Sequence, residues 1–267
     1  MNMLGNIYIA ENDMKNATEM FTKILKSYPY DFIYDPYDGE RTFDGPAGAI
    51  ALSSLISITS DLENVQSDYK KSIGYAYRLI RDYQGARVQI WEGIFSWEES
   101  AAMAILRILK NKNEPVWKRE REVKKINGIL KNDQLKADLL LKIGDLYRRS
   151  GQSEQALRVF GEVIENYPYT FKVDEEGSGY FIVHSLDAYI GKIYTYKQYK
   201  YPKNEQIDTT NEMKTHYDKF LVFLEQDYKG EYSEHYSIYC KSVYGSNEGQ
   251  KEYEKGYLFE KYYHIGE

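Results

Sequence analysis

Apolar residues recur at spacings of three and four along most of the chain, and this pattern predicts helices. It is clearest between residues 140 and 168, where two such stretches are separated by a short turn at 150–152. The apolar positions are Leu140, Ile143, Leu146 and Tyr147 in the first stretch, and Ala156, Val159, Phe160, Val163 and Ile164 in the second. Gly151 suits the left-handed position that ends a helix, and Pro168 cannot continue one. The stretch therefore predicts a helical hairpin with one apolar seam.

The same hairpin pattern occurs at the start of the chain. Leu4, Gly5, Tyr8, Ala17, Phe21 and Pro29 correspond, at one constant spacing, to Ile143, Gly144, Tyr147, Ala156, Phe160 and Pro168. The agreement continues past the hairpin, because Ser-Tyr-Pro-Tyr-Asp-Phe at 27–32 parallels Asn-Tyr-Pro-Tyr-Thr-Phe at 166–171. We interpret this as a duplication and predict two tandem modules, 1–130 and 131–267, that form one continuous solenoid.

These positions of small and large residues resemble the tetratricopeptide repeat, a helical hairpin of about 34 residues with a terminal proline. The resemblance implies an all-α fold, an α-solenoid of antiparallel helix pairs. It also implies a concave surface, lined by the first helix of each pair, that binds a protein or peptide. The long loops after each Tyr-Pro resemble those of bacterial envelope proteins of this family. That resemblance implies a place in the cell envelope or outside the cell, with the cytoplasm left open.

The segments between the hairpins give further signals. Residues 28–46 and 169–179 are rich in Tyr, Asp and Gly, and we expect both to be loops. Asp13 is a suitable N-cap for a helix over 14–27. A capping box from Ser96 to Glu99 is expected to open another helix, and a second, from Thr209 to Glu212, to open a helix over 210–228.

Composition narrows the function. The net charge of −6 gives no general attraction to nucleic acid. Cys240 is the sole cysteine, so there is no intrachain disulfide framework. No apolar run approaches the roughly 20 residues of a membrane-spanning helix. The 28 tyrosines suit a thin solenoid core, and they also suit contact surfaces, where tyrosine is enriched.

No catalytic, cofactor or metal motif is present. His184 and Asp187 are three residues apart on a predicted helix, but the other histidines are scattered and packed or solvated roles are favoured. The acidic loop at 35–45 does not have the spacing of a calcium-binding EF-hand. We therefore expect a protein that is not an enzyme and holds neither cofactor nor metal.

Two functions remain. The first is a scaffold that binds a protein or peptide, and the resemblance places the contact residues on first helices: Asp145, Arg148, Arg149, Lys192 and Tyr196. The second is a structural protein that self-associates end to end into a filament or ring. The last stretch of the chain is too apolar for a polar cap, and its candidate contact residues are Tyr253, Tyr257, Phe259 and Tyr262.

Overall fold

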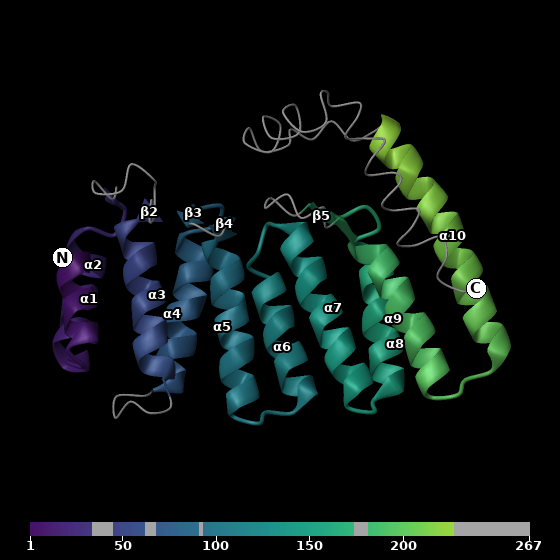
Figure 1. Ribbon diagram of the computed structural model, residues 1–267, viewed down its shortest axis with the longest axis horizontal. Helices are drawn as coiled ribbons and strands as arrows, with labels where there is room; N and C mark the ends of the chain where they lie inside the picture. The colour runs from purple at the N-terminus through teal and green to yellow at the C-terminus, as the bar shows by residue number, and fades with distance from the viewer. Residues whose placement is uncertain (34–44, 62–67, 91–92, 174–180, 227–267) are drawn as a thin grey trace. The chain divides into compact units, whose positions relative to one another are not determined.

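The computed structural model of the chain describes residues 1–33, 45–61, 68–90, 93–173 and 181–226 (Figure 1). The chain divides into two compact units, Met1–Lys131 and Asn132–Glu267. In the described residues of both units, consecutive α-helices run in opposite directions and pack on their neighbours. The predicted all-α repeat fold is therefore confirmed.

The first unit is a row of six described helices. They are α1 (Asn2–Ala10), α2 (Met14–Ser27), α3 (Ala47–Ser60), α4 (Tyr69–Asp82), α5 (Trp97–Asn111) and α6 (Val116–Asn127). Each helix packs on the next, and the largest fully buried aliphatic side chains of the row come from α2, α3, α4 and α5. The chain after α6 is fastened to the end of α4, because the Gln84 side chain donates to the Ile129 carbonyl and accepts from the Lys131 amide.

The second unit repeats the arrangement with α7 (Asp133–Arg149), α8 (Ser153–Asn166), α9 (His184–Gln198) and α10 (Lys203–Gln226). The helix over 210–228 expected from the sequence begins earlier than predicted. Thr209 is buried inside α10 and does not cap it, so the capping box from Thr209 to Glu212 is wrong. Its side chain lies instead in the buried face of a helix that is longer than predicted.

Local signals set several of the other helix ends. Asp13 and Ser96 accept hydrogen bonds from the first-turn amides of Asn16 and Glu99, as a capping side chain should. Gly151 has a φ of 81°, the left-handed conformation expected of it between α7 and α8.

Short antiparallel ribbons join the helix pairs, and two of the ribbons use residues from 28–46 and 169–179, which the sequence predicted as loops. They are β1 (Phe32–Ile33) with β2 (Gly45–Pro46), β3 (Arg87–Ile90) with β4 (Gly93–Ser96), and β5 (Phe171–Val173) with β6 (Phe181–Val183). Each ribbon brings the chain from a second helix back to the start of the next first helix. Pairing satisfies backbone groups in these connections, and strands this short carry no alternation that a sequence pattern could reveal.

Phe21 on α2 and Phe160 on α8 each fill the space beside a glycine on a first helix. A Cβ added at Gly5 would lie 2.7 Å from the Phe21 ring. In the second unit the Phe160 ring lies between two glycines, since a Cβ at either Gly144 or Gly191 would lie 2.5 Å from it. The predicted small and large positions therefore meet at the helix crossings.

Candidate interaction surfaces

A groove between α3 and α5 is the first candidate surface. Its volume is about 450 Å³, within the range of ligand-binding pockets. Ile56, Leu79 and Ala101 are buried at its base. The rim is formed by Ser53 and Ser57 of α3 and by Ser100, Met103, Ala104 and Arg107 of α5. The two helices contribute facing stripes, because residues three or four apart lie on the same side of a helix.

The polar side chains that line this groove form no hydrogen bonds within the described part of the chain. In the described part of the chain, neither the hydroxyls of Ser53, Ser57 and Ser100 nor the Arg107 guanidinium hydrogen bonds to another residue. Helix α3 carries no ionisable side chain, so Arg107 is not neutralised from across the groove. Met103 keeps 38% of its surface exposed. The groove can therefore offer an apolar floor, several hydroxyls and one cation to a ligand.

Sequence reasoning missed this groove, although a signal was present. Residues 47–60 are apolar apart from glycine, serine and threonine, and Ser53 and Ser57 are one turn apart. Such a stretch reads as a buried helix. That interpretation is correct for most of α3, but it does not reveal that Ser53 and Ser57 face the groove.

In the second unit the structure brings three of the predicted contact residues together at the end of α7. Asp145 pairs with Arg148 at 2.9 Å and with Arg149 at 3.3 Å. The Arg148 guanidinium also donates to the Gln198 side chain on α9, at 3.2 Å. Arg149 is 71% exposed and retains the most freedom to meet a partner.

The two predicted residues on α9 are placed differently from each other. Lys192 is half-buried. Tyr196 is only 8% exposed and its ring packs edge-on against Tyr201, with ring centres 5.2 Å apart. Burial raises the pKa of the Tyr196 hydroxyl, with a further contribution from the nearby Glu205 carboxylate. Tyr196 therefore presents little surface to a partner.

The residues predicted to mediate self-association, Tyr253, Tyr257, Phe259 and Tyr262, lie outside the described residues, as do the acidic loop at 35–44 and Cys240.

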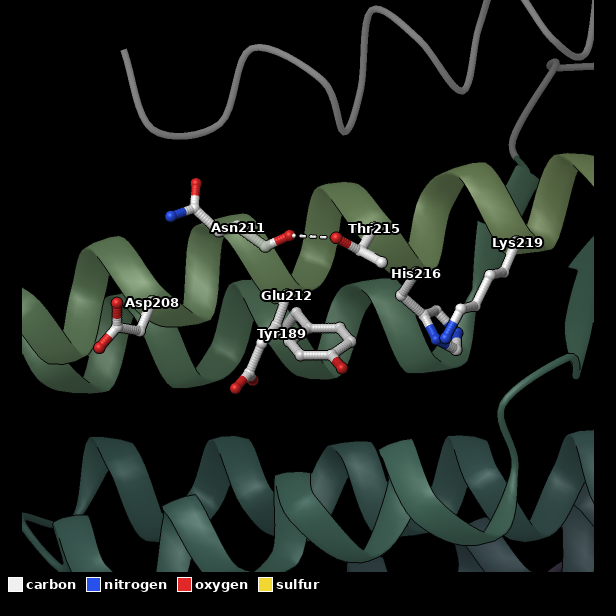
Figure 2. Close-up of a pocket in the computed structure, with 7 residues that line it drawn as sticks. All are labelled: Tyr189, Asp208, Asn211, Glu212, Thr215, His216 and Lys219. Carbon is white, nitrogen blue, oxygen red and sulfur yellow. Dashed lines mark hydrogen bonds between the residues drawn. The ribbon is translucent and has the colours of Figure 1, made fainter.

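A pocket of about 500 Å³ lies along α10, next to Tyr189 of α9 (Figure 2). The α10 residues that line it are Asp208, Asn211, Glu212, Thr215, His216 and Lys219. Burial raises the pKa of the Tyr189 hydroxyl, and the Glu212 carboxylate raises it further. All of these α10 residues except Asp208 lie within the helix predicted over 210–228, so what the sequence pattern lacked was the packing of that helix beside Tyr189.

His216 also closes a corner of the second unit. Its Nε2 lies 2.9 Å from the Pro168 carbonyl and 2.9 Å from the Ser185 Oγ, and that hydroxyl donates to Pro168 at 2.8 Å. Because a carbonyl can only accept, Nε2 carries the proton. His216 is therefore not a base toward Ser185, and the buried pair is a structural contact and not a catalytic dyad.

Both described histidines are held neutral. Burial lowers the pKa of His216, and the Lys219 ammonium adds to this effect against the opposing hydrogen bond to Pro168. Burial likewise lowers the pKa of His184, although Asp138 and Asp187 oppose it. The His184 ring is fully buried, and its nitrogens have no hydrogen-bond partner among the described residues.

The described residues contain no group of three or more His, Cys, Asp or Glu side chains that could hold a metal ion. Within the same ranges, no helix combines the length and apolar character that a membrane span requires.

The comparisons with known proteins identify the hairpins. One model of the tetratricopeptide repeat matches residues 1–31 and another matches residues 138–168. These ranges hold α1 with α2 and most of α7 with α8, the two hairpins in which the glycine and phenylalanine positions coincide. Neither a curated protein nor a solved structure matches the chain. On the strength of these two matches and the helical fold, the chain contains tetratricopeptide repeats.

Proposed function

We propose that the chain is a non-enzymatic scaffold that binds a protein or peptide partner through the exposed sides of its first helices. Tetratricopeptide repeats mediate protein–protein interaction, and the surface that first helices line is the concave one. The groove between α3 and α5 carries the proposal, since its hydroxyls and the Arg107 guanidinium have no partner among the described residues.

The chemistry of the groove indicates the kind of segment it would take. Its base is apolar, Met103 is an adaptable apolar contact, and Arg107 favours a carboxylate. We expect a partner segment that carries small apolar side chains beside an acidic one. At the end of α7, Arg148 and Arg149 outnumber Asp145 and would also favour an acidic segment.

A displayed library of random peptides, selected against the immobilised full chain, tests the groove. Peptides that occupy it should bind Arg107→Glu and Ser57→Trp about tenfold more weakly or worse, because one change reverses the charge and the other fills the space. Lys15→Glu on α2, away from the groove, is the matched control. Selected peptides that bind all these variants equally would remove the groove from the proposal.

The predicted residues of the second unit are tested separately with Arg148→Glu combined with Arg149→Glu. Acidic peptides should lose affinity for this double variant, while Arg158→Glu on α8 should retain it. If the peptides bind the double variant at full strength, these two arginines are not part of the contact surface.

End-to-end self-association is the second candidate function, and the apolar side of α1 favours it. Met3, Leu4 and Ile7 keep 69%, 39% and 46% of their surfaces exposed. Single exposed apolar side chains are ordinary, but three on one short helix form a patch that another chain could cover. Light scattering should then show oligomers that Met3→Lys with Ile7→Lys disperses. Oligomers that persist in this variant would reject the α1 contact.

A further inference from the structure

The exposed strip along α10 has a charge pattern that the scaffold function does not use. We define the α10 strip by its residues Asp208, Asn211, Glu212, Thr215, His216 and Lys219. Figure 2 shows them in succession along the helix, with Asp208 at one end and Lys219 at the other. The Asp208 and Glu212 carboxylates lie in the N-terminal half and the Lys219 ammonium in the C-terminal half, so the strip is acidic at one end and basic at the other.

The charged side chains of the strip have no ion-pair partners among the described residues. Asp208, Glu212 and Lys219 form no ion pair with any residue that the structure describes. Elsewhere in the same unit some charged side chains are paired within their helix, as Lys142 is with Asp138. Apart from His216, which is half-buried, the side chains of the strip are exposed. The strip therefore has the character of a surface that lacks its partner.

Residues at equal distances on either side of the centre of the strip form chemically complementary pairs. Counted outward from the centre between Met213 and Lys214, the strip pairs a carboxylate with an ammonium, an amide with an imidazole, and a carboxylate with a hydroxyl. These pairs are Asp208 with Lys219, Asn211 with His216, and Glu212 with Thr215. The Asp208–Lys219 pair sets a carboxylate against an ammonium that forms no ion pair with the described residues, whereas the Thr215 hydroxyl already donates to the Asn211 carbonyl at 3.0 Å and His216 Nε2 to the Pro168 carbonyl.

The spacing along the helix has the same symmetry. Asp208, Glu212, Thr215 and Lys219 follow one another at intervals of four, three and four, which places all of them on one side of α10. A second, antiparallel copy of this helix would meet each residue with its complement, because residue i contacts j and j contacts i across a twofold axis. Such a spacing also suits helices packed about 8–10 Å apart.

We propose that the α10 strip binds the α10 strip of a second copy of this chain in an antiparallel, twofold arrangement. Two Asp208–Lys219 pairs flank the axis, and each is separated from it by about 8 Å along the helix. Val222, 48% exposed and one turn beyond Lys219, adds an apolar contact at each end. The contact closes on itself and gives a dimer, which distinguishes it from end-to-end stacking.

Charge exchange in the full chain tests this proposal. Asp208→Lys alone or Lys219→Asp alone places like charges opposite each other at two points of the contact. Each should weaken the dimer about tenfold or more in a concentration series followed by light scattering. The combination of both changes in one chain restores opposite charges and should restore the dimer. Circular dichroism confirms that these exposed substitutions leave the helices intact.

Mixing the two single variants gives the sharpest result. A chain with Asp208→Lys has two cations and a chain with Lys219→Asp has two carboxylates, so the mixture should form a heterodimer although each variant alone is monomeric. A monomeric parent chain at every concentration, a mixture that stays monomeric, or a double variant that does not recover the dimer would each overturn the proposal. Met3→Lys with Ile7→Lys, which tests stacking through α1, should leave this dimer unchanged. Formation of the dimer should in turn leave peptide binding in the α3–α5 groove unaffected.

Discussion

The two units close the same corner of the repeat with different side chains. In the first, the Pro29 carbonyl accepts from the Tyr83 hydroxyl at 2.8 Å and from the Gly48 amide at 3.1 Å. In the second, the Pro168 carbonyl accepts from Ser185 and His216. The buried carbonyl has to be satisfied in both, but a phenol does this in one unit and an ionisable imidazole in the other.

Because of this difference, the second unit is expected to be more sensitive to acid than the first. No histidine precedes His184 in the sequence, so the first unit has none. The second unit has two described histidines that folding holds in the neutral form. A duplicated backbone corner can therefore be kept while its response to pH is changed by the choice of donor.

The largest expected effect concerns the glycines beside the phenylalanine rings. Gly144→Ala should lower the free energy of unfolding by about 3 kcal/mol and Gly5→Ala by only about 1 kcal/mol. Both rings are buried, but Phe160 packs against a second glycine, Gly191, whose Cβ position also lies 2.5 Å from the ring, whereas Gly5 is the one glycine found against Phe21 in the described residues. Urea denaturation followed by circular dichroism measures both.

The control for this pair is Gly74→Ala, since a Cβ at Gly74 would meet no atom within 4 Å. It should be neutral or stabilising by up to about 1 kcal/mol, because alanine favours the helix. Equal losses at Gly5 and Gly144 would contradict the account of a ring confined between two glycines.

The next largest effect is expected when Gly48 of the first unit and Ser185 of the second, which occupy equivalent places beside the proline carbonyls, are each replaced by the other's residue type. A Cβ at Gly48 would overlap the Tyr83 hydroxyl and the Pro29 carbonyl, so Gly48→Ser should cost about 2 kcal/mol. Ser185→Gly in the second unit removes a hydrogen bond and should cost about 1 kcal/mol. Combining Gly48→Ser with Tyr83→Phe should recover part of the loss, because the nearest clashing atom is gone. A Gly48→Ser variant that unfolds like the parent would show that the corner can relax.

Acid should weaken the second unit before the first. The pKa of each described histidine is lowered in the folded state from its ordinary value of 6.5, so the unfolded chain binds protons first as pH falls. Their contribution is fully present above that value and is lost as pH falls through it, toward the lower folded pKa. The loss is at most about 1.4 kcal/mol per pH unit for each histidine.

Hydrogen exchange with mass spectrometry, corrected for the intrinsic pH dependence of exchange, separates the units. Between pH 7 and pH 5, protection should fall more in α8 and α9 than in α3 and α4. His216→Phe should reduce that difference, since it removes one of the titrating groups. A uniform loss of protection in both units would break the comparison.

The smallest expected effect is the removal of a single donor in the first unit. Tyr83→Phe should cost about 1 kcal/mol, because the Pro29 carbonyl keeps its bond from Gly48. This cost should not change between pH 7 and pH 5, unlike that of His216→Phe. Thermal melts at the two pH values provide the measurement.

The sequence by itself determined those features that depend on residues within one or two helical turns. The three-and-four spacing of apolar residues placed the hairpins, Asp13 and Ser96 their caps, and Gly151 the turn between α7 and α8. Such signals are local, because a cap or a helix face is formed by neighbours a few residues apart. The pairing of Gly144 with Phe160 could be anticipated for the same reason, since both belong to one hairpin.

Only the tertiary structure decided which residues of a helix remain available. Tyr196 has the spacing of an exposed residue but is buried against Tyr201, and Thr209 has the pattern of a cap but lies within α10. The groove between α3 and α5 and the corner at Pro168 unite residues from separate helices. Contacts of that kind depend on how helices pack, and spacing along the chain does not encode them locally.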